Sequence, residues 1–151
     1  MQESEIVLRR LMAAWQAADT LELFEIFSPT AVYDDFPNQT TYRGPEEIVG
    51  YVTAVHAWAS DVVVNVTGMH AGDSMAVAEW IFAGVQDRPI GDRVPVATGR
   101  EVVLNGVTII ELERGRIVRA ADYIDSAALV LQLGGTIELP GGRTITLDDV
   151  R

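Results

Sequence analysis

Apolar residues recur every three to four positions in three segments near the start of the chain, a spacing typical of amphipathic helices. The first segment covers residues 4–18, and the second, residues 21–27, is stopped by Pro29. The third begins at Pro45, a residue type favoured in the first helical turn, and two glutamates follow that suit the positive end of the helix dipole. The pattern therefore predicts three helices.

The strands are predicted from a different periodicity. After a brief strand at residues 31–36 and a loop at 37–44, the chain from residue 61 onward alternates apolar and polar positions and is rich in Val and Ile. This alternation predicts four longer strands separated by turns. They cover residues 62–69, 75–83, 99–112 and 116–124.

Helices followed by strands that are joined through short turns favour an α+β fold, with the three N-terminal helices packed on one face of a curved antiparallel sheet. No repeat or linker divides the sequence. We therefore predict one domain over residues 1–134. A tail at 135–151, with a hairpin pattern around its Pro-Gly-Gly turn, is expected to belong to the same domain.

Composition narrows the class of function. The 151 residues are 48% hydrophobic and carry a formal net charge of −11, which argues against nucleic acid and anionic membranes as partners. There is no cysteine, and the N-terminus lacks the basic start and apolar run of a signal peptide, so we expect a cytoplasmic protein. His56 and His70 stand apart, and no metal or nucleotide motif is present. We therefore predict chemistry without a metal or cofactor.

Asp122 is the one residue of the last predicted strand that alternation leaves without a structural role. It shares a face with Ala120 and Ile124, and Ile117 takes the opposite face. Asp125, by contrast, is well placed to cap a short apolar helix that follows. A carboxylate on an apolar face is either paired with an arginine or a backbone amide, exposed, or tuned for proton transfer.

Several segments, in this order and spacing, resemble one superfamily. They are residues 31–37 (AVYDDFP), 42–45 (YRGP), 98–100 (TGR) and 115–134, which includes GRI, DYID and QLG. Over residues 4–134 the chain resembles the nuclear-transport-factor-2-like, or ketosteroid-isomerase-like, superfamily. It is most similar to the SnoaL-like polyketide cyclases and the limonene-epoxide hydrolases.

The resemblance implies a cone in which helices on the concave face of the sheet enclose a deep apolar pocket. Asp122 falls where both groups of enzymes carry a catalytic aspartate. Tyr33 and Asp35 fall where the hydrolases hold a tyrosine and an asparagine that position water, and Asp35 also resembles the base of the ketosteroid isomerases. The resemblance further implies a homodimer formed through the outer face of the sheet.

Two strands depart from these patterns. The hydrolases carry an arginine and a second aspartate where this chain has Trp80 and Phe82, and the cyclases carry glutamine and histidine where it has Gly106 and Thr108. We predict that a set of inward-facing residues lines the wall or the mouth of the pocket. The alternative role for these residues is packing in the core. These candidates are Trp80, Phe82, Thr108, Ala120, His56, Tyr51 and Trp58.

If Asp35 and Asp122 face one pocket, they resist double ionisation, so that one can act as general acid and the other as general base. We therefore predict an acid–base enzyme that acts on a small apolar substrate, most simply a SnoaL-like cyclase performing an aldol-type ring closure. Epoxide hydrolysis or an epoxide-opening cyclisation is one alternative. A non-catalytic module that binds a small ligand is another.

Overall fold

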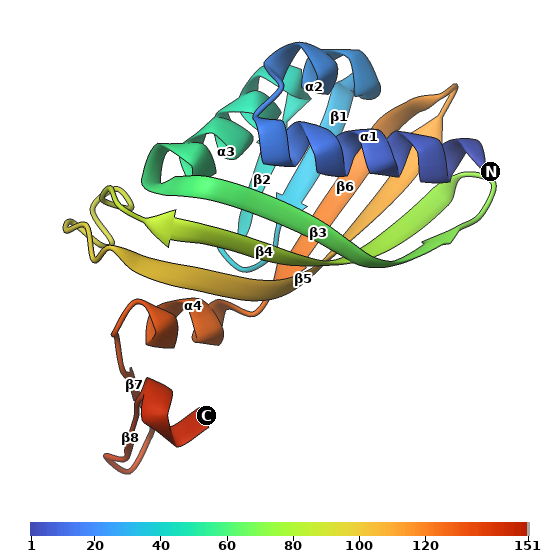
Figure 1. Cartoon of the computed structure of the whole chain (residues 1–151). Helices are drawn as coiled ribbons and strands as arrows, with labels where there is room; N and C mark the ends of the chain where they lie inside the picture. Colours follow the sequence, from blue (N-terminus) through green and yellow to red (C-terminus); the bar gives the residue numbers. More distant parts are fainter. Residues whose placement is uncertain (151) are drawn as a thin grey trace.

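The computed structural model describes residues 1–150, and the predicted helices and long strands are all present in it (Figure 1). The elements are α1 (Glu3–Ala17), α2 (Thr20–Ile26), β1 (Phe27–Asp35), β2 (Thr40–Arg43), α3 (Gly44–Trp58), β3 (Ala59–Ala71), β4 (Met75–Gln86), β5 (Arg100–Glu113), β6 (Arg116–Ile124), α4 (Ser126–Gln132), β7 (Ile137–Glu138), β8 (Thr144–Ile145) and a 3-10 helix (Leu147–Val150). As predicted, Asp125 caps α4, and its carboxylate accepts a hydrogen bond of 3.1 Å from the Ala128 amide.

Six strands form one curved, open sheet in the order β2-β1-β6-β5-β4-β3, and α1, α2 and α3 cover its concave face (Figure 1). The α+β prediction is therefore confirmed. The sheet is not wholly antiparallel, because β1 pairs with β6 in parallel across the long connection through α3 and β3–β5. This parallel pairing places Asp35 directly opposite Asp122.

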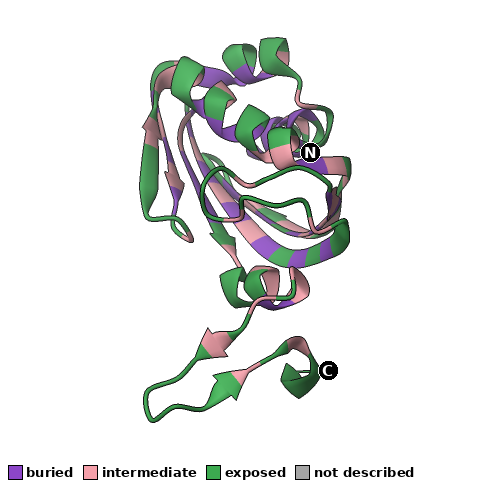
Figure 2. Cartoon of the chain, turned by 90° about the vertical axis from the view of Figure 1, so that its left-hand side faces the viewer, coloured by how far each residue is buried: buried purple, intermediate pink, exposed green. Residues whose placement is uncertain are grey.

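The core lies between the helices and the concave face of the sheet. Leu8 and Leu11 of α1 and Ile48 and Val52 of α3 are fully buried, as the spacing of three or four residues predicts. Each such side chain contributes about 1.5–3 kcal/mol through its removal from water. Buried and exposed residues alternate along the strands in Figure 2, which fits a sheet with one packed face and one open face.

Two local predictions were wrong. Residues 40–43, predicted as loop, form the edge strand β2, which pairs with β1 from Asp35–Thr40 to Val32–Arg43. The segment is too short and too polar to show an alternation of its own. In β6, Ile117 lies in the core and not on the outer face as predicted. The reason is a bulge: Val118 has no partner in the pairing with β5, so the residues that precede it point to the opposite face from the one that simple alternation predicts.

The C-terminal tail forms the predicted hairpin, with Ile137 opposite Ile145. It adjoins α4 and projects away from the body of the protein (Figures 1 and 2). Arg151, the last residue of the predicted tail, lies outside the described residues. Among residues 1–150, none of the helices has the length and apolar character needed to cross a membrane.

Candidate active site

A cavity of about 730 Å³ opens between the concave face of the sheet and the helices. Its walls come from α1, α3 and α4, from strands β3–β6, and from the loop that joins β4 to β5. The lining is mostly apolar, and its only charged residues within the described chain are Asp122 and Arg93. A volume of this size suits a small organic ligand.

Asp122 is 2% exposed and receives three hydrogen bonds from hydroxyl groups. Its Oδ1 accepts from Tyr33 at 2.9 Å and from Thr108 at 2.6 Å, and its Oδ2 accepts from Tyr51 at 2.8 Å. An ionised carboxylate offers about four acceptor positions. The three hydroxyls therefore leave one position open, on Oδ2, and Asp122 is among the residues that line the cavity.

Two indole groups set the direction of this network. The Nε1–H of Trp15 donates to the Tyr33 hydroxyl at 3.0 Å, and the Nε1–H of Trp80 donates to the Thr108 hydroxyl at 2.9 Å. An indole N–H can only donate. Each of these two hydroxyls therefore accepts from an indole and directs its own proton to Asp122.

The electrostatics of the site favour proton exchange near neutral pH. Burial raises the pKa of Asp122 from 3.8 to about 6, and the three hydroxyl donors, which lower it, limit the rise. The negative charge of Asp35 adds a smaller upward contribution. Burial also raises the pKa values of Tyr33 and Tyr51 well above 10.0, so both remain protonated donors at neutral pH.

Asp35 is adjacent to Asp122 in the sheet but does not line the cavity. It is 1% exposed, its Oδ2 accepts from the side-chain amide of Asn38 at 2.8 Å, and within residues 1–150 its Oδ1 has no hydrogen-bond partner. The two carboxylates are not hydrogen-bonded to one another in the described structure. Asp35 thus acts on Asp122 through its charge.

The structure separates the predicted pocket residues into two groups. Those that line the cavity are Tyr51, Trp58, Trp80, Phe82 and Thr108. Ala120 and His56 do not: Ala120 is fully buried in the core, and His56 turns toward α1, where its Nε2 lies 2.7 Å from the Trp15 carbonyl oxygen. Tyr33 is fully buried behind the wall and reaches the site only through its hydroxyl.

Gly106 explains how Trp80 fits. The two residues are opposite one another in β4 and β5, and a Cβ at position 106 would lie 2.2 Å from the Trp80 ring. Real Cβ atoms do not approach other atoms so closely. The missing side chain at this position therefore allows the indole to lie against β5 and to reach Thr108.

Two residues of the network were not predicted in their roles. Tyr51 lines the cavity as predicted, but it is buried beside Asp122 and not exposed at a mouth. The centroid of its ring lies 4.9 Å from that of Trp15, 5.2 Å from that of Tyr33 and 4.5 Å from that of Tyr42. Trp15 fits the apolar face of α1, and its spacing there does not reveal the indole donor. For Tyr51 the available signal was its position three residues after Ile48, on the inner face of α3.

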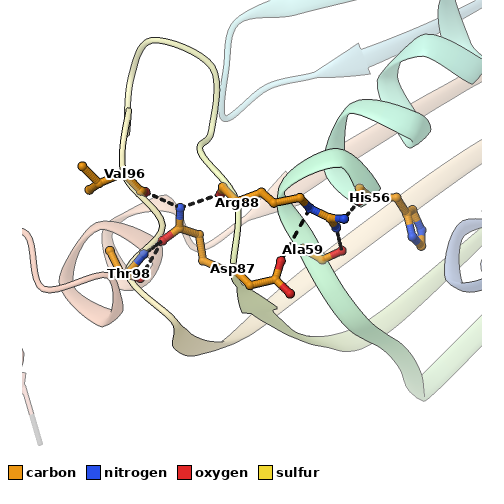
Figure 3. Close-up of polar contacts among 7 residues, drawn as sticks. His56, Ala59, Asp87, Arg88, Val96 and Thr98 are labelled. Carbon is orange, nitrogen blue, oxygen red and sulfur yellow. Dashed lines mark hydrogen bonds and ion pairs between the residues drawn. The ribbon is translucent and has the colours of Figure 1, made fainter.

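The loop between β4 and β5 is anchored at its base. Gln86, fully buried, donates to the carbonyl oxygens of Arg88 and Val96 and accepts from the Thr98 amide and hydroxyl (Figure 3). Arg88 in turn donates to the carbonyl oxygens of His56 and Ala59. These bonds hold the loop so that it forms one side of the cavity. Residues 1–150 contain no group of three His, Cys, Asp or Glu side chains that could hold a metal ion.

Comparisons with known proteins agree with this fold. The model of the SnoaL-like domain family matches residues 8–120, and the chain belongs to this family. No curated protein matches the sequence. Among solved structures, TsrD from Streptomyces laurentii is similar at 24% identity, with a TM-score of 0.76 over 87% of this chain and 95% of that one.

Two further structures show the same fold. A protein from Jannaschia sp. CCS1, provisionally named a SnoaL-like polyketide cyclase, has a TM-score of 0.78 at 19% identity over 87% of this chain and 91% of that one. A protein with a ketosteroid isomerase-like fold from Catenulispora acidiphila has a TM-score of 0.72 at 19% identity over 85% and 92% of the two chains. Identities this low support the fold and not a shared reaction.

Proposed function

We propose that the protein is an acid–base catalyst that needs no cofactor and closes a ring in a small apolar polyketide-like substrate, with Asp122 as the proton acceptor. The observation that carries this proposal is a buried carboxylate that lines an apolar cavity, has a pKa of about 6 and keeps one acceptor position without a hydrogen bond from the described residues. A general base is most effective when its pKa lies near the operating pH. The family and the names of its structural neighbours support the same class of reaction.

In the proposed reaction, Oδ2 of Asp122 takes a proton from a carbon next to a carbonyl group. The C–H bond breaks, and the electron pair passes into an enolate. The enolate carbon then attacks a second carbonyl of the same molecule, a C–C bond forms, and the resulting alkoxide takes the proton back from Asp122. The Tyr51 hydroxyl stabilises the carboxylate before and after this exchange, and the apolar walls fold the chain and exclude water.

The proposal assigns Tyr33 and Thr108 to holding the carboxylate, and Asp35 to raising its basicity through charge. Epoxide opening has less support, since Trp80 and Phe82 offer neither a cation nor an acid where the resemblance to the hydrolases places that pair. A ligand-binding module without turnover is the remaining alternative, and the same experiment distinguishes it.

The test is solvent deuterium exchange into 2-tetralone, an apolar bicyclic ketone, followed by NMR at neutral pD. We expect the protein to catalyse exchange next to the carbonyl, Asp122→Asn to abolish it, and Asp35→Asn to reduce it. Asp34→Asn, in which the neighbouring aspartate outside the cavity is changed, serves as the matched control and should exchange like the wild type. Equal exchange in Asp122→Asn would refute the proposal, and tight ketone binding without exchange would favour the binding module.

A further inference from the structure

Arg93 gives the cavity a second charge that the proposed reaction does not use. It is exposed and lines the cavity, whereas Asp122 lies at its buried end. The walls between these two charges are mostly apolar. A ligand that fills the cavity therefore meets a negative charge at the deep end and a positive charge at the mouth.

Within the described residues, the Arg93 guanidinium is held by a side-chain amide oxygen and not by a carboxylate. The Nη1 of Arg93 donates to Oδ1 of Asn38 at 2.5 Å, and the side-chain Nδ2 of Asn38 donates to Oδ2 of Asp35 at 2.8 Å. Among residues 1–150 Arg93 forms no ion pair, although the protein carries 22 acidic and 11 basic side chains. A guanidinium has five N–H donors in a planar fork that matches a carboxylate, so the bond to Asn38 leaves most of them open.

We infer that Arg93 selects ligands with an apolar body and an anionic end, a carboxylate being the group that fits its fork, and orients them with this end at the mouth and the reacting carbon at Asp122. The inference deepens the proposed function and rests on it for the role of the cavity. Asp122, when ionised, repels an anionic group from the deep end, so the two charges favour the same orientation. The substrate class is thus an oxo acid with an apolar chain.

Octanoate and octanamide provide a matched pair of probes, since they share chain and shape and differ in charge. All three tryptophans of the protein, Trp15, Trp58 and Trp80, line the cavity, so their emission reports occupancy, and calorimetry gives the Kd. We expect octanoate to bind about fivefold more tightly than octanamide at low salt, as for a partly exposed ion pair, with the preference shrinking as salt rises.

Three variants test the assignment to Arg93. Arg93→Gln should bring the two Kd values together by weakening octanoate alone, and Arg93→Lys should retain most of the preference. Arg114→Gln removes the same charge from the turn at the other end of β5 and should change neither Kd.

The inference is overturned if the wild type shows no preference, if neither probe binds, or if Arg93→Gln and Arg114→Gln have equal effects. Its failure is separable from that of the proposed function. Ketone exchange that survives without a carboxylate preference overturns the role of Arg93 alone. A preference that depends on Arg93, in a protein without exchange activity, overturns the proposed reaction alone.

Discussion

The unfolding free energy of Asp122→Asn, measured relative to that of the wild type, should increase as the pH rises. The reason is that the folded protein holds the proton of Asp122 up to a pKa of about 6, whereas the group's ordinary pKa is 3.8. Between these values the native state binds more protons than the unfolded state, so wild-type stability falls as the pH increases. Asparagine keeps the shape and does not titrate.

The magnitude follows from the same pKa values. A separation of about two pH units, at 1.36 kcal/mol for each, amounts to about 3 kcal/mol once Asp122 is ionised in both states. For a chain of this length, that corresponds to a difference in Tm of about 6–12 °C. The difference between variant and wild type should grow from about pH 4 to about pH 6 and remain constant above it.

The assay is thermal or urea unfolding of both proteins, followed by circular dichroism at half-unit steps from pH 4 to pH 8. Any cost of fitting an amide among the three hydroxyl groups is independent of pH and only offsets the difference curve. Its slope therefore reports the titration of Asp122, including the interaction of Asp122 with the charge of Asp35. A flat difference curve, or one that falls with pH, would refute the reasoning that this carboxylate is held in an unfavourable apolar setting.

Three further predictions concern neighbouring features. Tyr51→Phe removes the hydrogen-bond donor to Oδ2 and should therefore raise the pKa of Asp122. The acid limb of the plot of exchange rate against pH should then move up by about one pH unit. An acid limb at the wild-type pH would contradict the role of this hydrogen bond. Gly106→Ala should displace Trp80 and destabilise the fold by about 1–3 kcal/mol, seen as a lower urea midpoint and shifted tryptophan emission, and unchanged values would exclude the packing argument. We also propose a homodimer through the outer sheet face, where Val103 and Tyr123 are 43% and 47% exposed. Light scattering should show a dimer that Val103→Lys weakens, and a wild-type monomer would disprove it.

The helices, the long strands and the inward direction of Asp122 could be predicted because they depend on local periodicity, which the short strand β2 lacks. The strand alternation places Asp122 beside Ala120, and both are buried as expected. What local periodicity does not contain is the position of one element against another. Tyr51 reaches Asp122 across 71 residues of sequence, and Asp35 lies opposite Asp122 only because β1 and β6 pair in parallel.

The same limit explains the errors at Ala120 and His56. Both were placed on the pocket wall from the face of the element that carries them, but a face includes residues that pack behind the wall as well as residues that form it. Whether Ala120 meets the cavity depends on how the neighbouring side chains fill the space around it, and the direction of the His56 ring depends on a carbonyl group of α1.

The hydroxyl network around Asp122 is asymmetric, and this asymmetry defines a path for the proton. Tyr33 and Thr108 each already accept a hydrogen bond from an indole, whereas no hydrogen bond to the Tyr51 oxygen is present in the described structure. When Asp122 gains a proton on Oδ2, rotation about the C–O bond of Tyr51 is the smallest rearrangement that turns a donor into an acceptor. The hydroxyls of Tyr33 and Thr108 are therefore each held by an indole donor, whereas the Tyr51 hydroxyl can rotate. The site can thus accommodate the carboxylic acid form of Asp122 without any movement of the aromatic rings.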